Sequence, residues 1–125
     1  MIATGWQIAL GGAAGALCRH ATVVGAQRLV GPDFPLGIAI VNVLGSFLGG
    51  IIIVVLSGNE LERYSPLLIT GFLGGYTTYS AYSLEFWKLY DSGRLETAFV
   101  FAAGSALLAL MAVFLGIALA RSFGP

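Results

Sequence analysis

The residues of this sequence best suited to chemistry lie in one segment, residues 71–83, which reads GFLGGYTTYSAYS. It combines three glycines with closely spaced hydroxyls and aromatic rings, between an apolar and an amphipathic run. Within a bilayer, non-helical backbone persists only where it is buried in protein or lines a wet cavity. An interrupted helix also exposes carbonyls that can hold a cation and N–H groups that can meet an anion. The segment therefore predicts a glycine-broken helix at membrane depth, with an ion-conducting site around it.

The composition places the whole chain in a lipid bilayer. Of the 125 residues, 58% are hydrophobic and 10% are charged, whereas soluble domains carry about 25% charged residues. The formal net charge is zero, which removes the electrostatic argument for a nucleic-acid partner. The single cysteine, Cys18, excludes an intrachain disulfide and a cysteine metal cluster. The sequence offers no nucleophile–base pair and no phosphate-binding loop, so we do not expect an enzyme.

The elements that position this segment are predicted to be four membrane-spanning helices in one all-α domain covering residues 1–125. Apolar runs separated by polar loops place the spans at about residues 6–30, 36–56, 65–90 and 95–120. Each is long enough, since a helix of about 20 apolar residues crosses a bilayer. Ser65 and Pro66 predict the start of the third span, as a hydroxyl N-cap followed by proline. The first residues carry no Lys or Arg, so no signal peptide is predicted.

Three polar side chains inside the spans each leave two interpretations open. Arg19 either extends to the membrane interface or makes a wet vestibule attractive to anions. Asn42 either bonds to a neighbouring helix or donates its amide N–H groups to a passing anion, since an unbonded amide is costly in a bilayer. Glu85 either pairs with an arginine such as Arg19 or faces the vestibule. The sequence alone does not choose between these interpretations.

The loop charges favour a dimer of two inverted copies. Four helices make a thin wall around a wet path, and a second copy would complete that wall. Arg28, Lys88 and Arg94 would lie on one side of the membrane. Arg63 and Arg121 would lie on the other side, which leaves no usable positive-inside bias. We therefore expect the chain to insert in both orientations and to pair head to tail.

Residues 71–85, GFLGGYTTYSAYSLE, resemble the signature of the Fluc (CrcB-type) fluoride channels. Further matches lie in the first two spans: Gly12, Gly15, Arg19, Gly37, Val41, Asn42 and Gly45. The chain length and the four-span layout also agree with that family. The resemblance therefore covers the whole chain.

This resemblance implies an antiparallel, dual-topology homodimer in the inner (cytoplasmic) cell membrane, with two pores along the interface between subunits. The implied activity is passive, selective export of fluoride, which relieves fluoride toxicity in the cytoplasm. The resemblance also implies a structural sodium ion on the dimer twofold axis, held by the main-chain carbonyls of Gly74 and Thr77. The implied partners are thus fluoride, the lipid bilayer and an inverted second copy.

The pore residues implied by the resemblance come from all four spans. Asn42 matches the pore asparagine, and Arg19 matches a basic residue near the vestibule. Tyr79 and Tyr82 occupy the positions of two family phenylalanines, whose positively polarised ring edges are expected to meet fluoride. A strongly hydrated anion needs donors along its whole path. The hydroxyl donors expected here are those of Thr78, Ser80, Ser83 and Ser105.

Several positions depart from the family pattern. Ile38 stands where a threonine is common, while Phe101 and Ala109 stand where the fourth helix often carries a tyrosine and a serine. We therefore expect a drier pore wall, in which the hydroxyls of Tyr79 and Tyr82 replace some of the lost donors.

Other assignments stay open at this point. A small dual-topology multidrug or cation exporter has a similar size and number of spans. It is expected to carry a carboxylate within its first span, where this sequence has none. A purely structural membrane subunit would not need a third span that is broken and rich in hydroxyls. A homologous partner could also replace the second copy in a heterodimer.

Overall fold

The computed structural model describes residues 2–124, and within this range the secondary structure is entirely helical. The all-α prediction is therefore confirmed for these residues. The elements, in chain order, are α1 (Ile2–Val30), α2 (Leu36–Leu56), η1 (Glu60–Tyr64), η2 (Pro66–Leu73), α3 (Gly74–Tyr76), α4 (Tyr79–Asp91) and α5 (Leu95–Ser122).

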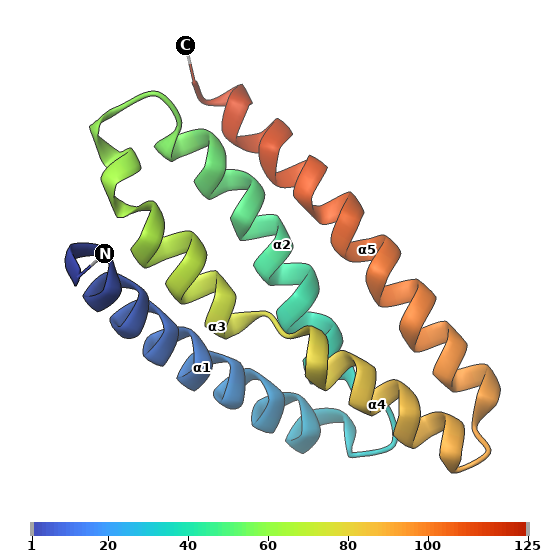
Figure 1. Cartoon of the computed structure of the whole chain (residues 1–125). Coiled ribbons are helices and arrows are strands. Elements are labelled where there is room, and N and C mark those ends of the chain that lie inside the picture. Colours follow the sequence, from blue (N-terminus) through green and yellow to red (C-terminus); the bar gives the residue numbers. More distant parts are fainter. Residues whose placement is uncertain (1, 125) are drawn as a thin grey trace.

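Three of these helices are long and apolar enough to cross a membrane: Thr4–Val30, Leu36–Leu56 and Leu95–Ser122. The predicted third span is divided into η2, α3 and α4, with 8, 3 and 13 residues. Each piece is shorter than the roughly 20 residues that a crossing helix needs, but end to end they run along the neighbouring helices (Figure 1). Both termini lie at the same end of the bundle in Figure 1, as an even number of crossings requires.

The third span is broken at Thr77 and Thr78. Both residues have extended backbones, with φ/ψ of −82°/159° and −152°/122°. The break was predicted, but its assignment to glycines was wrong, because Gly74 and Gly75 lie in the short helix α3 and Gly74 has helical angles of −60°/−35°. The chain leaves the helical conformation only after Tyr76.

Gly71 and Gly75 serve close packing rather than the break. A Cβ atom on Gly75 would lie 2.5 Å from the carbonyl oxygen of Gly12 on α1, and one on Gly15 would lie 2.1 Å from the carbonyl oxygen of Phe72. No real Cβ atom fits at such distances, so the backbones of α1 and of η2–α3 touch directly. Small residues permit this kind of contact between membrane helices.

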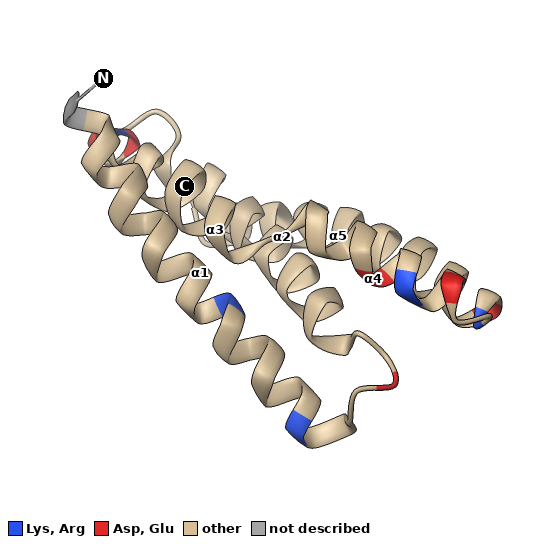
Figure 2. Cartoon of the chain, turned by 60° about the horizontal axis from the view of Figure 1, so that its bottom comes forward, with Lys and Arg blue, Asp and Glu red and all other residues tan. Residues whose placement is uncertain are grey.

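The break lets the third span change neighbours halfway along its length. The first half, η2 and α3, packs against α1, whereas α4 packs against α5 (Figure 1). Helix α2 contacts both halves and packs most extensively against α5. In the second view α4 runs away from α1, so that its far end lies well apart from that helix (Figure 2). The segment at the break therefore stands at the centre of the molecule, between two different packing partners.

The start of the third span differs in detail from the prediction. Pro66 does occupy the first helical position of η2, but Ser65 has helical angles and makes no side-chain cap. The side-chain cap lies earlier, where the N–H of Leu61 donates to Asn59 Oδ1 over 2.8 Å and begins η1. η2 is a π-helix, a wider winding that often occurs at functional sites.

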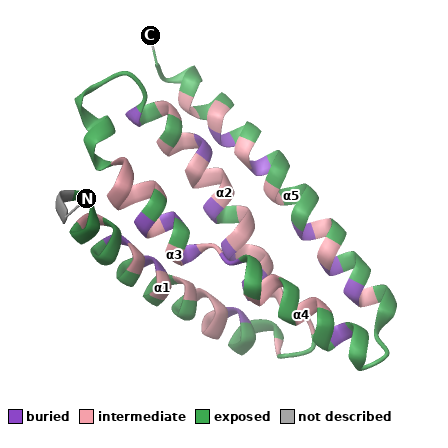
Figure 3. Ribbon diagram, in the orientation of Figure 1, coloured by how far each residue is buried: buried purple, intermediate pink, exposed green. Residues whose placement is uncertain are grey.

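Burial and charge agree with a bilayer around the helices. The buried residues lie mainly on the faces that the helices turn toward one another, and the outer faces are exposed (Figure 3). Large apolar residues such as Leu17, Leu108 and Phe114 are exposed on those outer faces. The charged residues gather near helix ends and along the outer part of α4, apart from one basic band partway along α1 (Figure 2).

Candidate functional site

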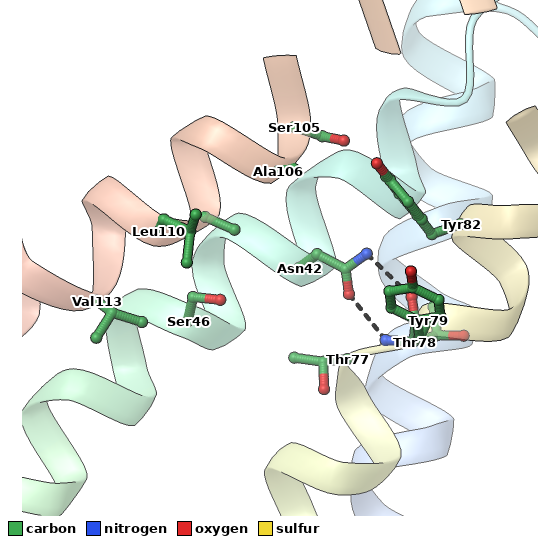
Figure 4. Close-up of a pocket in the computed structure, with 11 residues that line it drawn as sticks. Asn42, Ser46, Thr77, Thr78, Tyr79, Tyr82, Ser105, Ala106, Leu110 and Val113 are labelled. Carbon is green, nitrogen blue, oxygen red and sulfur yellow. Dashed lines mark hydrogen bonds between the residues drawn. The ribbon is translucent and has the colours of Figure 1, made fainter. Parts of the chain in front are cut away.

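Asn42, on α2, holds the break in place. Its Nδ2 donates to the carbonyl oxygen of Thr78 over 3.0 Å, and the N–H of Thr78 donates to Asn42 Oδ1 over 2.8 Å (Figure 4). Of the two interpretations of Asn42, the bond to a neighbouring helix is the one that the structure contains. A side-chain amide carries two N–H donors, so this pairing uses one of them and leaves the second.

The two threonines of the break cap the helix ends on either side of it. Thr77 directs both its N–H and its hydroxyl to the carbonyl of Leu73, over 2.9 Å and 2.8 Å. Thr78 Oγ1 accepts from the N–H of Ala81 over 3.1 Å, as an N-cap of α4 does. Because the Thr78 hydroxyl accepts in that bond, its own hydrogen stays available for another acceptor.

These hydrogen bonds divert the helical donors of two main-chain carbonyls. In a continuous α-helix, the N–H of Thr78 would donate to the carbonyl of Gly74, and the N–H of Ala81 to the carbonyl of Thr77. Here both N–H groups donate instead to side-chain oxygens, of Asn42 and of Thr78. The carbonyls of Gly74 and Thr77 thus lose their usual helical donors to side-chain oxygens, and Gly74 is exposed.

A hollow of about 480 Å³ lies beside the break, between α2, α4 and α5. It brings together five of the predicted pore residues: Asn42, Thr78, Tyr79, Tyr82 and Ser105. The remaining lining residues are Ser46, Thr77, Ala106, Ala109, Leu110 and Val113 (Figure 4). Ser46 was not predicted as a pore residue, although its place one helical turn after Asn42 puts both on one face of α2.

The two tyrosines of the hollow differ in what their hydroxyls can do. Tyr82 donates its hydroxyl hydrogen to the carbonyl of Ala102 on α5, with an O–O distance of 2.6 Å. Tyr79 is 81% exposed, and its ring centroid lies 5.7 Å from that of Tyr82. Since the hydroxyl of Tyr82 already bonds to α5, only Tyr79 can supply the additional donor that we expected from both.

The serine hydroxyls bond within their own helices. Ser105, which is buried, donates to the carbonyl of Phe101 over 2.5 Å, and Ser83 donates to the carbonyl of Tyr79 over 3.1 Å. Such a hydroxyl presents lone pairs to its surroundings and must break its bond before it can donate to an anion. Ser83 also lies outside the hollow. Fewer hydroxyl groups around the hollow are therefore free to donate than the sequence implies.

Arg19 and Ser80 belong to a second hollow, of about 320 Å³, between α1 and α4. It is also lined by Thr78, which therefore borders both hollows, and by Ile38 from α2. Most of the predicted pore residues thus fall into two groups, one at each hollow, and Ser83 lines neither. Sequence spacing could not separate these groups, because it does not show that α4 turns away from α1.

Glu85 does not pair with Arg19. Its Oε1 lies 3.4 Å from Nζ of Lys88, one turn further along α4. Of the positions that depart from the family pattern, Phe101 is fully buried against the rings of Phe34 and Tyr82, whereas Ala109 lines the larger hollow. Among the described residues there is no group of three or more His, Cys, Asp or Glu side chains that could hold a metal ion.

Comparison with known proteins identifies similar chains over almost the full length. The family model described as CrcB-like protein, Camphor Resistance (CrcB), matches residues 6–117. A protein of Cereibacter sphaeroides named fluoride-specific ion channel FluC is 47% identical over 123 residues, which are 98% of each chain. Proteins of the same name are 43% identical in Mesorhizobium japonicum, over 92% of this chain and 94% of the other, and in Ruegeria, over 97% of each.

Proposed function

The chain belongs to the CrcB-like family, and from this premise we propose that it is a multi-pass membrane channel that conducts fluoride. The relatives described above carry the name fluoride-specific ion channel. Such a protein is a channel and not an enzyme, as the sequence predicted. The structural observation that carries the proposal is the helix break, which Asn42 holds open beside a hollow lined by hydroxyls and aromatic rings.

A fluoride path needs donors, because an unsolvated small anion is very costly in a low-dielectric medium. The break offers three kinds of donor beside one another. The first N–H groups of α4 have no acceptor within the helix and carry the positive end of its dipole. Asn42 and Thr78, which carry the second amide N–H and the free hydroxyl hydrogen, both line the same hollow. We propose that these groups replace the water around the ion as it passes.

We further propose that an inverted second copy completes the pore. One chain supplies a wall from α2, α4 and α5, while Tyr79 and Gly74 stay exposed at the level of the break. A lipid-facing position would leave the carbonyls at the break without partners, and the bilayer core does not tolerate that. A second copy, or a homologous partner in the same place, would cover them. Cysteine labelling of the loop at residues 57–64 in intact cells tests the dual orientation, and labelling from one side only would oppose it.

A structural sodium ion fits the residues at the break. Sodium is a hard cation that takes oxygen ligands, as main-chain carbonyls provide in ion-binding sites. Gly74 and Thr77 would hold it, since theirs are the carbonyls whose helical donors go to Asn42 and Thr78. When bound, the ion would supply a fixed positive charge that lowers the cost of an anion nearby. We propose this role together with export across the inner (cytoplasmic) membrane, driven by the fluoride gradient alone.

The cation-exporter alternative receives no support from the described side chains. Glu85, the one acidic residue near the middle of a span, is engaged with Lys88 on its own helix. Helix α1 contains no acidic residue that could exchange protons for a cation. The purely structural alternative does not account for a break at which two side chains divert the main-chain donors.

The function is tested with purified protein reconstituted into liposomes that contain potassium fluoride. Efflux is recorded with a fluoride-selective electrode. We expect rapid fluoride efflux, and no chloride efflux under the same gradient. Asn42→Ala should slow the efflux strongly, whereas Ser122→Ala, on the exposed last turn of α5, should match the wild type. Equal passage of chloride and fluoride, or no passage of either, would rule the proposal out.

A further inference from the structure

Tyr76, the last residue of α3, is tied to α1 by a hydrogen-bond chain with a defined direction. Its hydroxyl oxygen lies 3.1 Å from Thr22 Oγ1, and Thr22 Oγ1 donates to the carbonyl of Cys18 over 2.9 Å. A threonine hydroxyl has one hydrogen and two lone pairs. Because that hydrogen goes to Cys18, Thr22 accepts from Tyr76, and the tyrosine is the donor.

The ring of Tyr76 is buried in apolar packing, and its hydroxyl is satisfied by the bond to Thr22. Tyr76 is 5% exposed, and its ring stacks on Phe72 with centroids 5.9 Å apart and planes 10° apart. Gly15 of α1 presses against this turn, because a Cβ there would lie 2.9 Å from the nitrogen of Tyr76. Backbone contact therefore brings the ring to α1, and Thr22 satisfies its hydroxyl.

The residues on either side of Thr77 are held by different helices. Tyr76 is bonded to α1 through Thr22, whereas Thr78 is bonded to α2 through Asn42. The methyl group of Thr77 fits against Gly45 of α2, where a Cβ would lie 2.3 Å from Thr77 Cγ2. The position of the break thus depends on two anchors, one to α1 and one to α2.

We propose that Tyr76 and Thr22 form a latch that positions the helix break. Without it, the end of α3 is held to α1 by packing alone, and Thr77 and Thr78 can move relative to α1. Tyr76 is a positioning residue, because it acts on the break carbonyls through the backbone and does not itself line either large hollow. The effect on ion passage rests on the proposed function, whereas the effect on the position of the break does not.

The latch is tested with Tyr76→Phe, Thr22→Val and the double variant. Thr22→Ser serves as rescue because it keeps the hydroxyl, and Tyr90→Phe, at an exposed position of α4, is the matched control. Amide hydrogen exchange of Thr77 and Thr78 is followed in nanodiscs, and fluoride efflux is titrated with sodium. We expect each single variant to speed exchange at the break and to raise the half-maximal sodium concentration about five-fold, which corresponds to about 1 kcal/mol.

The double variant should change both readouts no more than the single variants do, because either substitution removes the same bond. Thr22→Ser and Tyr90→Phe should behave as the wild type, and exchange in the α2–α5 contact should not change. Unchanged exchange at the break, or single effects that add in the double variant, would overturn the latch. If Tyr76→Phe does not fold, Thr22→Val decides, since it keeps the side-chain volume. If the wild type passes no fluoride, the proposed function fails, while the exchange measurement still decides the latch.

Discussion

Replacing Asn42 by leucine tests how the break is held. Leucine keeps the branching of the side chain at Cγ but removes both bonds to Thr78, a residue that is 8% exposed. A hydrogen bond between membrane helices is worth about 0.6 kcal/mol on average, and a buried donor left without a partner costs about 1–3 kcal/mol. Two lost bonds and one orphaned N–H therefore predict a loss of about 2–4 kcal/mol in the free energy of unfolding.

The structure also predicts how the Asn42→Leu variant would recover part of that loss. The N–H of Thr78 can return to its helical acceptor, the carbonyl of Gly74, if α3 continues by one more residue. The break would then begin to close, and the carbonyl proposed to hold sodium would be covered. We expect the variant to lose fluoride efflux and any dependence on sodium, beyond what its lower stability explains.

The assay is denaturant unfolding in mixed micelles, followed by fluoride efflux from liposomes. Ser46→Ala is the control, since Ser46 lines the same hollow one turn later on α2 and has no bond to the break. We expect its unfolding free energy to stay within about 0.5 kcal/mol of the wild type. If Asn42→Leu were as stable as Ser46→Ala, the view that this amide holds the break would be refuted.

Three further substitutions, one of them paired with a control, test other contacts. Tyr82→Phe removes the bond to the carbonyl of Ala102 and should lower the unfolding free energy by about 1 kcal/mol; no change would mean that the hydroxyl does not hold α4 to α5. Gly15→Ala places a Cβ against the backbone of η2 and should lower the unfolding free energy by about 1–3 kcal/mol and remove much of the efflux. Its control is Gly25→Ala, where an added Cβ has no neighbour within 4 Å, and this variant should be neutral or stabilising. Glu85→Gln should shift stability by less than about 1 kcal/mol, as for a surface pair, and should keep fluoride efflux; loss of transport would instead favour a carboxylate-dependent exporter.

Much of this protein follows from local features of its sequence. The apolar runs and their polar boundaries predict the all-α fold, and the second span at residues 36–56 matches α2 at both ends. The density of hydroxyls in residues 71–83 also locates the break within a few positions. These features can be predicted from the sequence because span length, turn residues and side-chain polarity are local properties of the chain.

Only the tertiary structure decides which residues make the break and what each polar group bonds to. Gly75 lies in a helix that the backbone of α1 touches directly. Thr77 and Thr78 unwind because Asn42, 36 residues away in sequence from Thr78, takes the N–H that would continue the helix. The hydroxyl of Tyr82 bonds to the carbonyl of Ala102 because packing places α5 beside α4. A hydrogen-bond donor takes the acceptor that packing brings near it, and for Thr78 and Tyr82 that acceptor comes from a helix distant in sequence.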